Sequence, residues 1–192
     1  RARERHRRWV IAPAEVEERL RESARVPAGV VLVAGRVGSW GLLLGLKEVH
    51  AGLPGLLFLA ESLPNPGLER FVAELRGTGG RASRRRRGAR AALRHVRRGG
   101  AVALLVDHGV RSDEGGVWAP FLGLPARTTP LPGWIAHRLG VPVLPVLCLP
   151  AEDGRYRIWV GPDLAEGLVD ADEATCVREV AARANRVREE VI

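Results

Sequence analysis

Four runs of consecutive apolar residues limit the folds that this chain can adopt. They cover residues 29–34, 56–60, 101–106 and 141–148, and each is preceded by a helical pattern. A strand that is covered on both faces carries apolar side chains at successive positions, whereas a half-exposed strand carries them at alternate positions. Because helical segments separate these strands, we predict an α/β fold with a mainly parallel sheet flanked by helices.

Periodicity and capping signals place the helices and one further strand. We predict helices over residues 13–25, 40–50, 66–76, 88–98 and 132–139, and a last helix from about residue 171. Asp170 and Glu173 are spaced as a capping pair for that last helix. Residues 155–160 alternate between apolar and polar side chains, which predicts a more exposed or edge strand.

The length favours one domain. A chain of 192 residues, 46% of them hydrophobic, can bury a core of its own. We divide it into an N-terminal basic segment with an amphipathic helix, residues 1–28, and an α/β domain, residues 29–192. The first residue is Arg and the chain contains no Met, so we expect it to be part of a longer protein. Its longest apolar runs fall well short of the roughly 20 residues that span a bilayer.

Positive charge indicates anionic partners. The formal net charge is +8 and the pI is about 11.1, which favours phospholipid headgroups, phosphorylated glycolipids, an acidic carrier protein or nucleic acid. The densest cluster is Arg84, Arg85, Arg86 and Arg87. It suits phosphate groups of a glycolipid or membrane, and a solvated helix face explains it equally well. Only 5% of the residues are aromatic and no nucleic-acid-binding motif appears, so we expect no specific nucleic-acid partner.

Two cysteines argue against a metal centre. Cys148 falls in an apolar strand and Cys176 in the last predicted helix, and neither has the CxxC or His–Cys spacing of a metal site. We therefore predict no metal and a reducing compartment.

Three segments follow the predicted strands at the edge where parallel sheets bind ligands. The first is Gly35-Arg36-Val-Gly38-Ser-Trp40-Gly41 and the second is Glu61-Ser-Leu-Pro-Asn65-Pro. The third begins at Asp107-His108 and contains Val-Trp-Ala-Pro-Phe121-Leu-Gly123-Leu-Pro-Ala-Arg-Thr. We expect the functional residues among these three segments.

In order and spacing, these segments resemble motifs of the late acyltransferases of lipid A synthesis, within the lysophospholipid acyltransferase superfamily. The first family motif reads Gly-His-Phe-Gly-Asn-Trp-Glu. Gly38 and Trp40 match it, whereas Arg36 stands at the position of the His and Gly41 at that of the acid. In the second motif, Arg-Pro-Leu-x-Asn-Pro, Asn65 matches and Glu61 replaces the Arg.

The third segment is similar to a family strand ending in Asp-Gln, followed by Val-x-Val-Pro-Phe-Phe-Gly-x-Pro-Ala-x-Thr. The resemblance implies transfer of a fatty acyl chain from acyl carrier protein or coenzyme A to a hydroxyl of a membrane glycolipid or phospholipid. It implies no cofactor beyond that thioester co-substrate, and a place at the cytoplasmic face of the bacterial inner membrane. The substrate-binding residues that it implies are Gly38, Trp40, Glu61, Asn65, Asp107, Phe121 and Gly123, to which the charge pattern adds Arg84, Arg85, Arg86 and Arg87.

The resemblance fails at the catalytic pair. In this family a His takes the proton of the attacking hydroxyl, and an acid orients that His. Arg36 is a permanent cation with no lone pair to accept a proton, and Gly41 has no side chain. We therefore interpret the chain as an impaired or inactive member of the family. A buried Arg36 would need an anionic partner, and Asp107 at the end of a nearby strand is the candidate.

Two alternatives remain open at this point. His108 and Asp113 are themselves a His, four residues and an acid, and would supply an active enzyme with another base. Against this, the motif places His108 at a Gln of the family. The other alternative is a basic module that binds anionic lipid or nucleic acid, which rests on charge alone.

Overall fold

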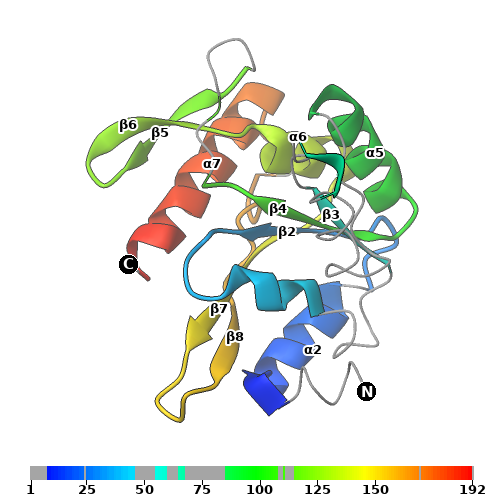
Figure 1. Cartoon of the computed structure of the whole chain (residues 1–192). Coiled ribbons are helices and arrows are strands. Elements are labelled where there is room, and N and C mark those ends of the chain that lie inside the picture. The colour runs from blue at the N-terminus through cyan, green and yellow to red at the C-terminus, as the bar shows by residue number, and fades with distance from the viewer. Residues whose placement is uncertain are drawn as a thin grey trace.

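The four predicted apolar strands lie side by side in a six-stranded sheet of the described part of the chain, with the order β1-β8-β7-β2-β4-β3 (Figure 1). The computed structural model describes residues 8–23, 25–45, 55–59, 65–67, 85–107, 110, 115–168 and 170–191. The strands of this sheet are β1 (Val10–Ile11), β2 (Val30–Ala34), β3 (Leu56–Leu59), β4 (Ala101–Leu105), β7 (Val143–Pro150) and β8 (Tyr156–Val160).

The sheet is mainly parallel, as predicted. β2 pairs in parallel with β4 on one side and with β7 on the other, and β3 extends the parallel part beyond β4. β8 is antiparallel to β7. All five residues of β2 are buried, which is why consecutive apolar residues are needed there.

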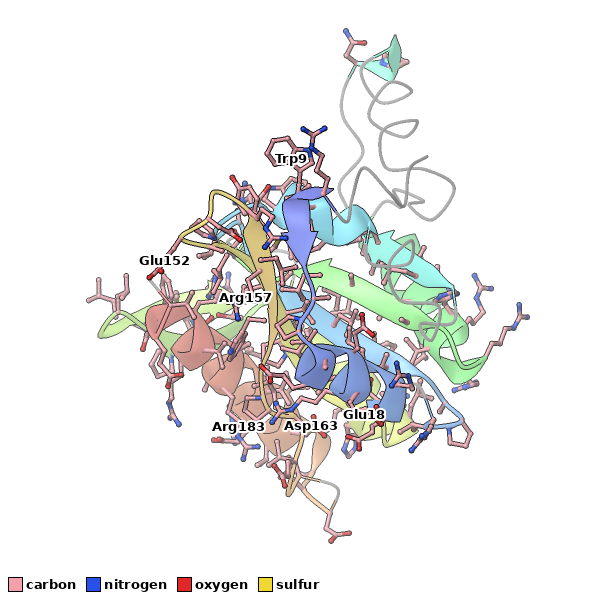
Figure 2. The ribbon with its side chains drawn as sticks, turned by 90° about the horizontal axis from the view of Figure 1, so that it is seen from below. Trp9, Glu18, Glu152, Arg157, Asp163 and Arg183 are labelled. Carbon is pink, nitrogen blue, oxygen red and sulfur yellow. The ribbon has the colours of Figure 1, made fainter. Side chains whose placement is uncertain are left out.

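Helices cover both faces of the sheet and complete a single α/β domain (Figure 1). One face packs against α2 (Ala14–Ser23) and the 3-10 helix η1 (Trp40–Gly45). The other face packs against α5 (Arg85–Arg97), α6 (Leu131–Leu139) and α7 (Glu173–Glu189). Viewed from below, α2 lies across the sheet with Glu18 at its surface (Figure 2).

The strand β8 corrects one expectation. Its alternation is confirmed, because Ile158 and Val160 are buried while Arg157 is exposed. The edge position is wrong, since the two-residue strand β1 pairs in parallel with β8 and lies outside it. A strand of two residues carries no readable period, so its pairing was not predictable from the sequence.

Two helix predictions also need correction. Asp172, and not Asp170, caps α7: its side chain accepts a hydrogen bond from the backbone N–H of Thr175 at 3.0 Å. The helix predicted over residues 40–50 is a 3-10 helix over residues 40–45, and residues 46–50 lie outside the described residues. Of the helix predicted over residues 66–76, only residues 66 and 67 are described.

A hairpin outside the main sheet was not predicted. Its strands β5 (Val117–Phe121) and β6 (Leu124–Thr128) are antiparallel and pack on α7 (Figure 1). The segment has Pro at 120 and 125 and Gly at 123, residues that normally interrupt strands, so it reads as a loop. Among the described residues, no helix combines the length and hydrophobicity that crossing a membrane requires.

Candidate functional site

Arg36 and Asp107 meet where the neighbouring strands β2 and β4 end. The strands are in register to Ala34 and Leu105, and each of the two charged residues lies two positions further on. Asp107 Oδ2 accepts the backbone N–H of Arg36 at 2.7 Å and its side-chain Nε–H at 3.0 Å. The pairing inferred from the sequence is therefore confirmed, although the Arg36 side chain is 48% exposed and not buried.

This contact sets the ionisation of Asp107. Partial burial acts to raise the pKa of its carboxyl, but the two hydrogen bonds and the positive charge of Arg36 outweigh burial. The pKa of Asp107 is consequently lowered from its usual value. Asp107 is thus a bound carboxylate with a reduced tendency to take up a proton.

The glycine-rich turn after β2 is held closely against β7. Gly38 has φ of 64°, and a Cβ at this position would collide with the carbonyl oxygen of Cys148. Ser39 N donates to that same oxygen at 2.8 Å, which ties the turn to β7. Trp40 is half-buried at the start of η1.

Gly41, the residue predicted to replace the family acid, is exposed. A Cβ added to it would meet nothing within 4 Å. The described residues thus leave room for a side chain at this position.

Arg188 of α7 is a site residue that the sequence reasoning missed. Only 8% of it is exposed, and its Cδ lies 3.3 Å from the place of a Cβ on Gly35. The guanidinium stacks over the Phe121 ring at 4.5 Å and donates through Nη2 to Asn185 Oδ1. Burial lowers the pKa of Arg188, and the charges of Asp107 and Glu189 oppose that shift.

A signal for Arg188 was present in the sequence. It follows Ala184 by four residues and therefore falls on the apolar stripe of the last helix, where a charged side chain needs a partner. Asn185 is its neighbour on the same buried side, with no exposed surface. Two polar side chains on an otherwise apolar helix face indicate that they form specific polar contacts with each other or with a neighbouring element.

Phe121 and Gly123 belong to the hairpin β5–β6. Phe121 reaches the site through its stacking on Arg188. Gly123 is exposed in the turn between the two strands, with φ of 75°. Asn65 is exposed, and its Oδ1 accepts the backbone N–H of Gly67 at 2.8 Å.

Several predicted site residues lie outside the described residues: Glu61, Arg84, His108 and Asp113. Arg85, Arg86 and Arg87 form the first turn of α5, but their side chains are outside the description as well. Two further arginines of the same cluster, Arg97 and Arg98, are exposed at the end of α5, beside the amino end of β4. They lie at the opposite end of β4 from Asp107.

Among the described residues, no group of three His, Cys, Asp or Glu side chains is arranged to hold a metal ion. The charges that meet at the described part of the site are the cations Arg36 and Arg188 and the carboxylates Asp107 and Glu189, both of which act on Arg188. This arrangement can hold an anionic or hydrogen-bonding group, and it contains no described general base.

The comparisons with known proteins agree with the fold and the motifs. The sequence matches the family described as bacterial lipid A biosynthesis acyltransferase over residues 2–192. No curated protein matches the chain significantly. Since the family match covers nearly the whole sequence, the chain belongs to the bacterial lipid A biosynthesis acyltransferase family.

Proposed function

We propose that this protein binds the lipid and acyl ligands of its family at the carboxyl ends of β2 and β4, and does not transfer the acyl group by His–acid catalysis. The Arg36–Asp107 ion pair is the single observation that carries this proposal. It stands where a catalytic His would need a free lone pair and an orienting acid.

The chemistry of acyl transfer supports the loss of activity. A hydroxyl attacks a thioester slowly unless a base removes its proton as the bond forms. Arg36 donates hydrogen bonds only. Asp107 is a weaker base than an ordinary carboxylate, because its pKa is lowered. Gly41 adds no group that would orient a base or activate one.

The exposed guanidinium of Arg36 supports retained binding. Arg36 and Arg188 bring two positive charges to the site, and the carboxylates Asp107 and Glu189 balance them. A guanidinium that is half exposed, as that of Arg36 is, offers N–H groups to phosphate oxygens in a paired geometry. The phosphorylated headgroup of a lipid A precursor has that chemistry. Such binding places the protein at a bacterial membrane surface, the cytoplasmic face of the inner membrane by the family's location.

The test is an acyl-transfer assay with a radiolabelled acyl-carrier thioester and a phosphorylated lipid A precursor as acceptor. We expect no turnover above the uncatalysed rate for the wild type, together with measurable binding of the precursor. The double variant Arg36→His, Gly41→Glu restores both catalytic side chains, the second at a position where an added Cβ meets nothing within 4 Å, and is expected to gain activity. The single variant Gly41→Glu is the matched control and should stay inactive.

Three results would contradict this proposal. Robust wild-type turnover that is abolished by His108→Ala and by Asp113→Asn would show that the chain is an active enzyme with another base. Turnover with both variants unaffected would also contradict the proposal. An inactive wild type that does not bind the precursor would leave no support for retained ligand binding.

A further inference from the structure

The hairpin β5–β6 carries most of the large hydrophobic residues that are exposed in the part of the chain that the structure describes. Four large hydrophobic residues are exposed among the described residues. Three of them belong to the hairpin: Trp118 is 62% exposed, Leu122 61% and Leu124 70%. The fourth, Trp9, lies apart from the hairpin (Figure 2). Clustered exposed hydrophobic residues mark an interaction site, whereas single ones are ordinary.

The exposure is a fixed property of the hairpin, because α7 holds the inner face. Asn185 Nδ2 donates to the carbonyl of Pro120 at 2.9 Å and to Thr128 Oγ1 at 3.0 Å. The backbone N–H of Leu122, in the turn, donates to Glu189 Oε1 at 2.5 Å. These bonds anchor both strands and the tip, so the apolar side chains are presented outward on a supported element.

The outer face of the hairpin suits lipid better than a protein strand. Pro120 pairs with Pro125 across the hairpin, and neither has an N–H to offer to an added strand. Trp118 faces its cross-strand partner Arg127, whose guanidinium lies 5.2 Å from the indole ring. Trp and Arg each combine an apolar body with a polar end, and both are favoured where hydrocarbon meets headgroups.

The positive net charge of the chain favours an anionic membrane over a neutral one. The chain carries a formal net charge of +8, which attracts it to a surface of anionic lipids and not to a neutral one. The hairpin also lies on the side of the molecule where the chain leaves β2 toward the site, at the left of Figure 1. A bilayer met by the hairpin is therefore close to the Arg36–Asp107 pair.

We propose that Leu122 and Leu124 at the hairpin tip, with Trp118 beside them, insert into the headgroup region of an anionic bilayer and turn the site toward it. This inference rests on the proposed function only in that the ligand of the site is a lipid. Insertion itself requires neither catalysis nor the Arg36–Asp107 pair. It names the hairpin as the element by which the protein docks.

The experiment is vesicle flotation with the full chain, using phosphatidylcholine vesicles with and without about one third phosphatidylglycerol and no lipid A precursor. The test variant is Leu122→Asn, Leu124→Ser. Asn suits position 122, where φ is 50°, because it tolerates the left-handed region. The matched control is Trp9→Ala, which removes the exposed apolar residue away from the hairpin.

We expect the double variant to bind anionic vesicles about tenfold more weakly than the wild type, given the apolar area of two leucine side chains. Trp9→Ala should bind like the wild type. The loss should persist at about 0.5 M salt, where screening weakens the attraction of exposed charges. A thermal unfolding curve matching that of the wild type would show that the variant is folded.

Insertion also has a local readout. Brominated lipids should quench part of the tryptophan emission of the wild type, and Trp118→Phe should remove that part.

Wild-type binding by the double variant, unchanged quenching in Trp118→Phe, or equal binding to neutral and anionic vesicles would each overturn the proposal. So would a dimer in lipid-free solution that the double variant abolishes, because a second copy would then cover the tip. None of these readouts depends on acyl transfer, so failure here is distinguishable from failure of the proposed function.

Discussion

Arg36 donates two hydrogen bonds to one oxygen of Asp107, from its backbone N at 2.7 Å and from its Nε at 3.0 Å. The contact joins residues 71 positions apart and links the carboxyl ends of β2 and β4. The residue predicted to replace the family's proton acceptor is thus a cation in an ion pair. That ion pair supplies a cross-strand contact.

Asp107→Asn should lower stability in a pH-dependent way. The pKa of Asp107 is lowered in the folded protein, so its contribution is present above the unfolded value, about 3.9, and is lost as the pH falls through the folded value. We expect the variant to be about 1 kcal/mol less stable at pH 7, allowing for the solvent exposure of Arg36. The difference should shrink below about pH 4. Urea unfolding at pH 7 and at pH 3 measures both values, and an equal difference at the two pH values would contradict the assignment.

Asn185→Leu should be strongly destabilising. Asn185 has no exposed surface, donates to Pro120 O and Thr128 Oγ1, and accepts a hydrogen bond from Arg188 Nη2. Its loss leaves buried acceptors and a buried guanidinium without their partner, at a cost of about 2–3 kcal/mol. Denaturant unfolding checks the value. Arg186→Ala, an exposed change on the same helix, should cost less than about 0.5 kcal/mol.

Gly133→Ala should disrupt the contact between α6 and α7. A Cβ on Gly133 would lie 2.7 Å from Val177 Cα and 3.1 Å from the carbonyl oxygen of Cys176, both backbone atoms that cannot rotate away. We expect a loss of about 1–2 kcal/mol even though Ala is the better helix former. Gly41→Ala is the control, since its Cβ meets nothing, and its unfolding curve should match that of the wild type. If both variants unfolded alike, the close approach of the two helices would be refuted.

Cys148 should resist alkylation while the protein is folded. It is fully buried, and desolvation raises the pKa of its thiol to about 11, so little of the reactive thiolate exists at pH 8. Iodoacetamide at pH 8, followed by peptide mass spectrometry, should label Cys148 at least about a hundredfold more slowly in buffer than in denaturant. Rapid labelling in buffer would mean that β7 opens readily. Cys176, whose thiol pKa is also raised by burial, gives a second reading in the same experiment.

The sequence by itself determined the layered α/β architecture. Runs such as residues 30–34 and 101–105 are apolar at every position, and only strands covered on both faces require that pattern. It also indicated Asp107 as the candidate partner of Arg36, because parallel strands end at one edge of the sheet, although the burial supposed for Arg36 is not found. The cap of the last helix was less well determined. The sequence spacing predicted Asp170, whereas the structure shows that Asp172 accepts the Thr175 N–H.

Only the tertiary structure decided the features that depend on contacts between distant residues. Val10 and Ile11 become a strand because β8 offers them a free edge, and two residues carry no period. The hairpin β5–β6 forms despite its prolines because Asn185 and Glu189 of α7 bind its backbone. Arg188 enters the site because α7 packs over Gly35 and Phe121. Local periodicity reports which face of an element is buried, but which side chains meet there is set by how the elements pack.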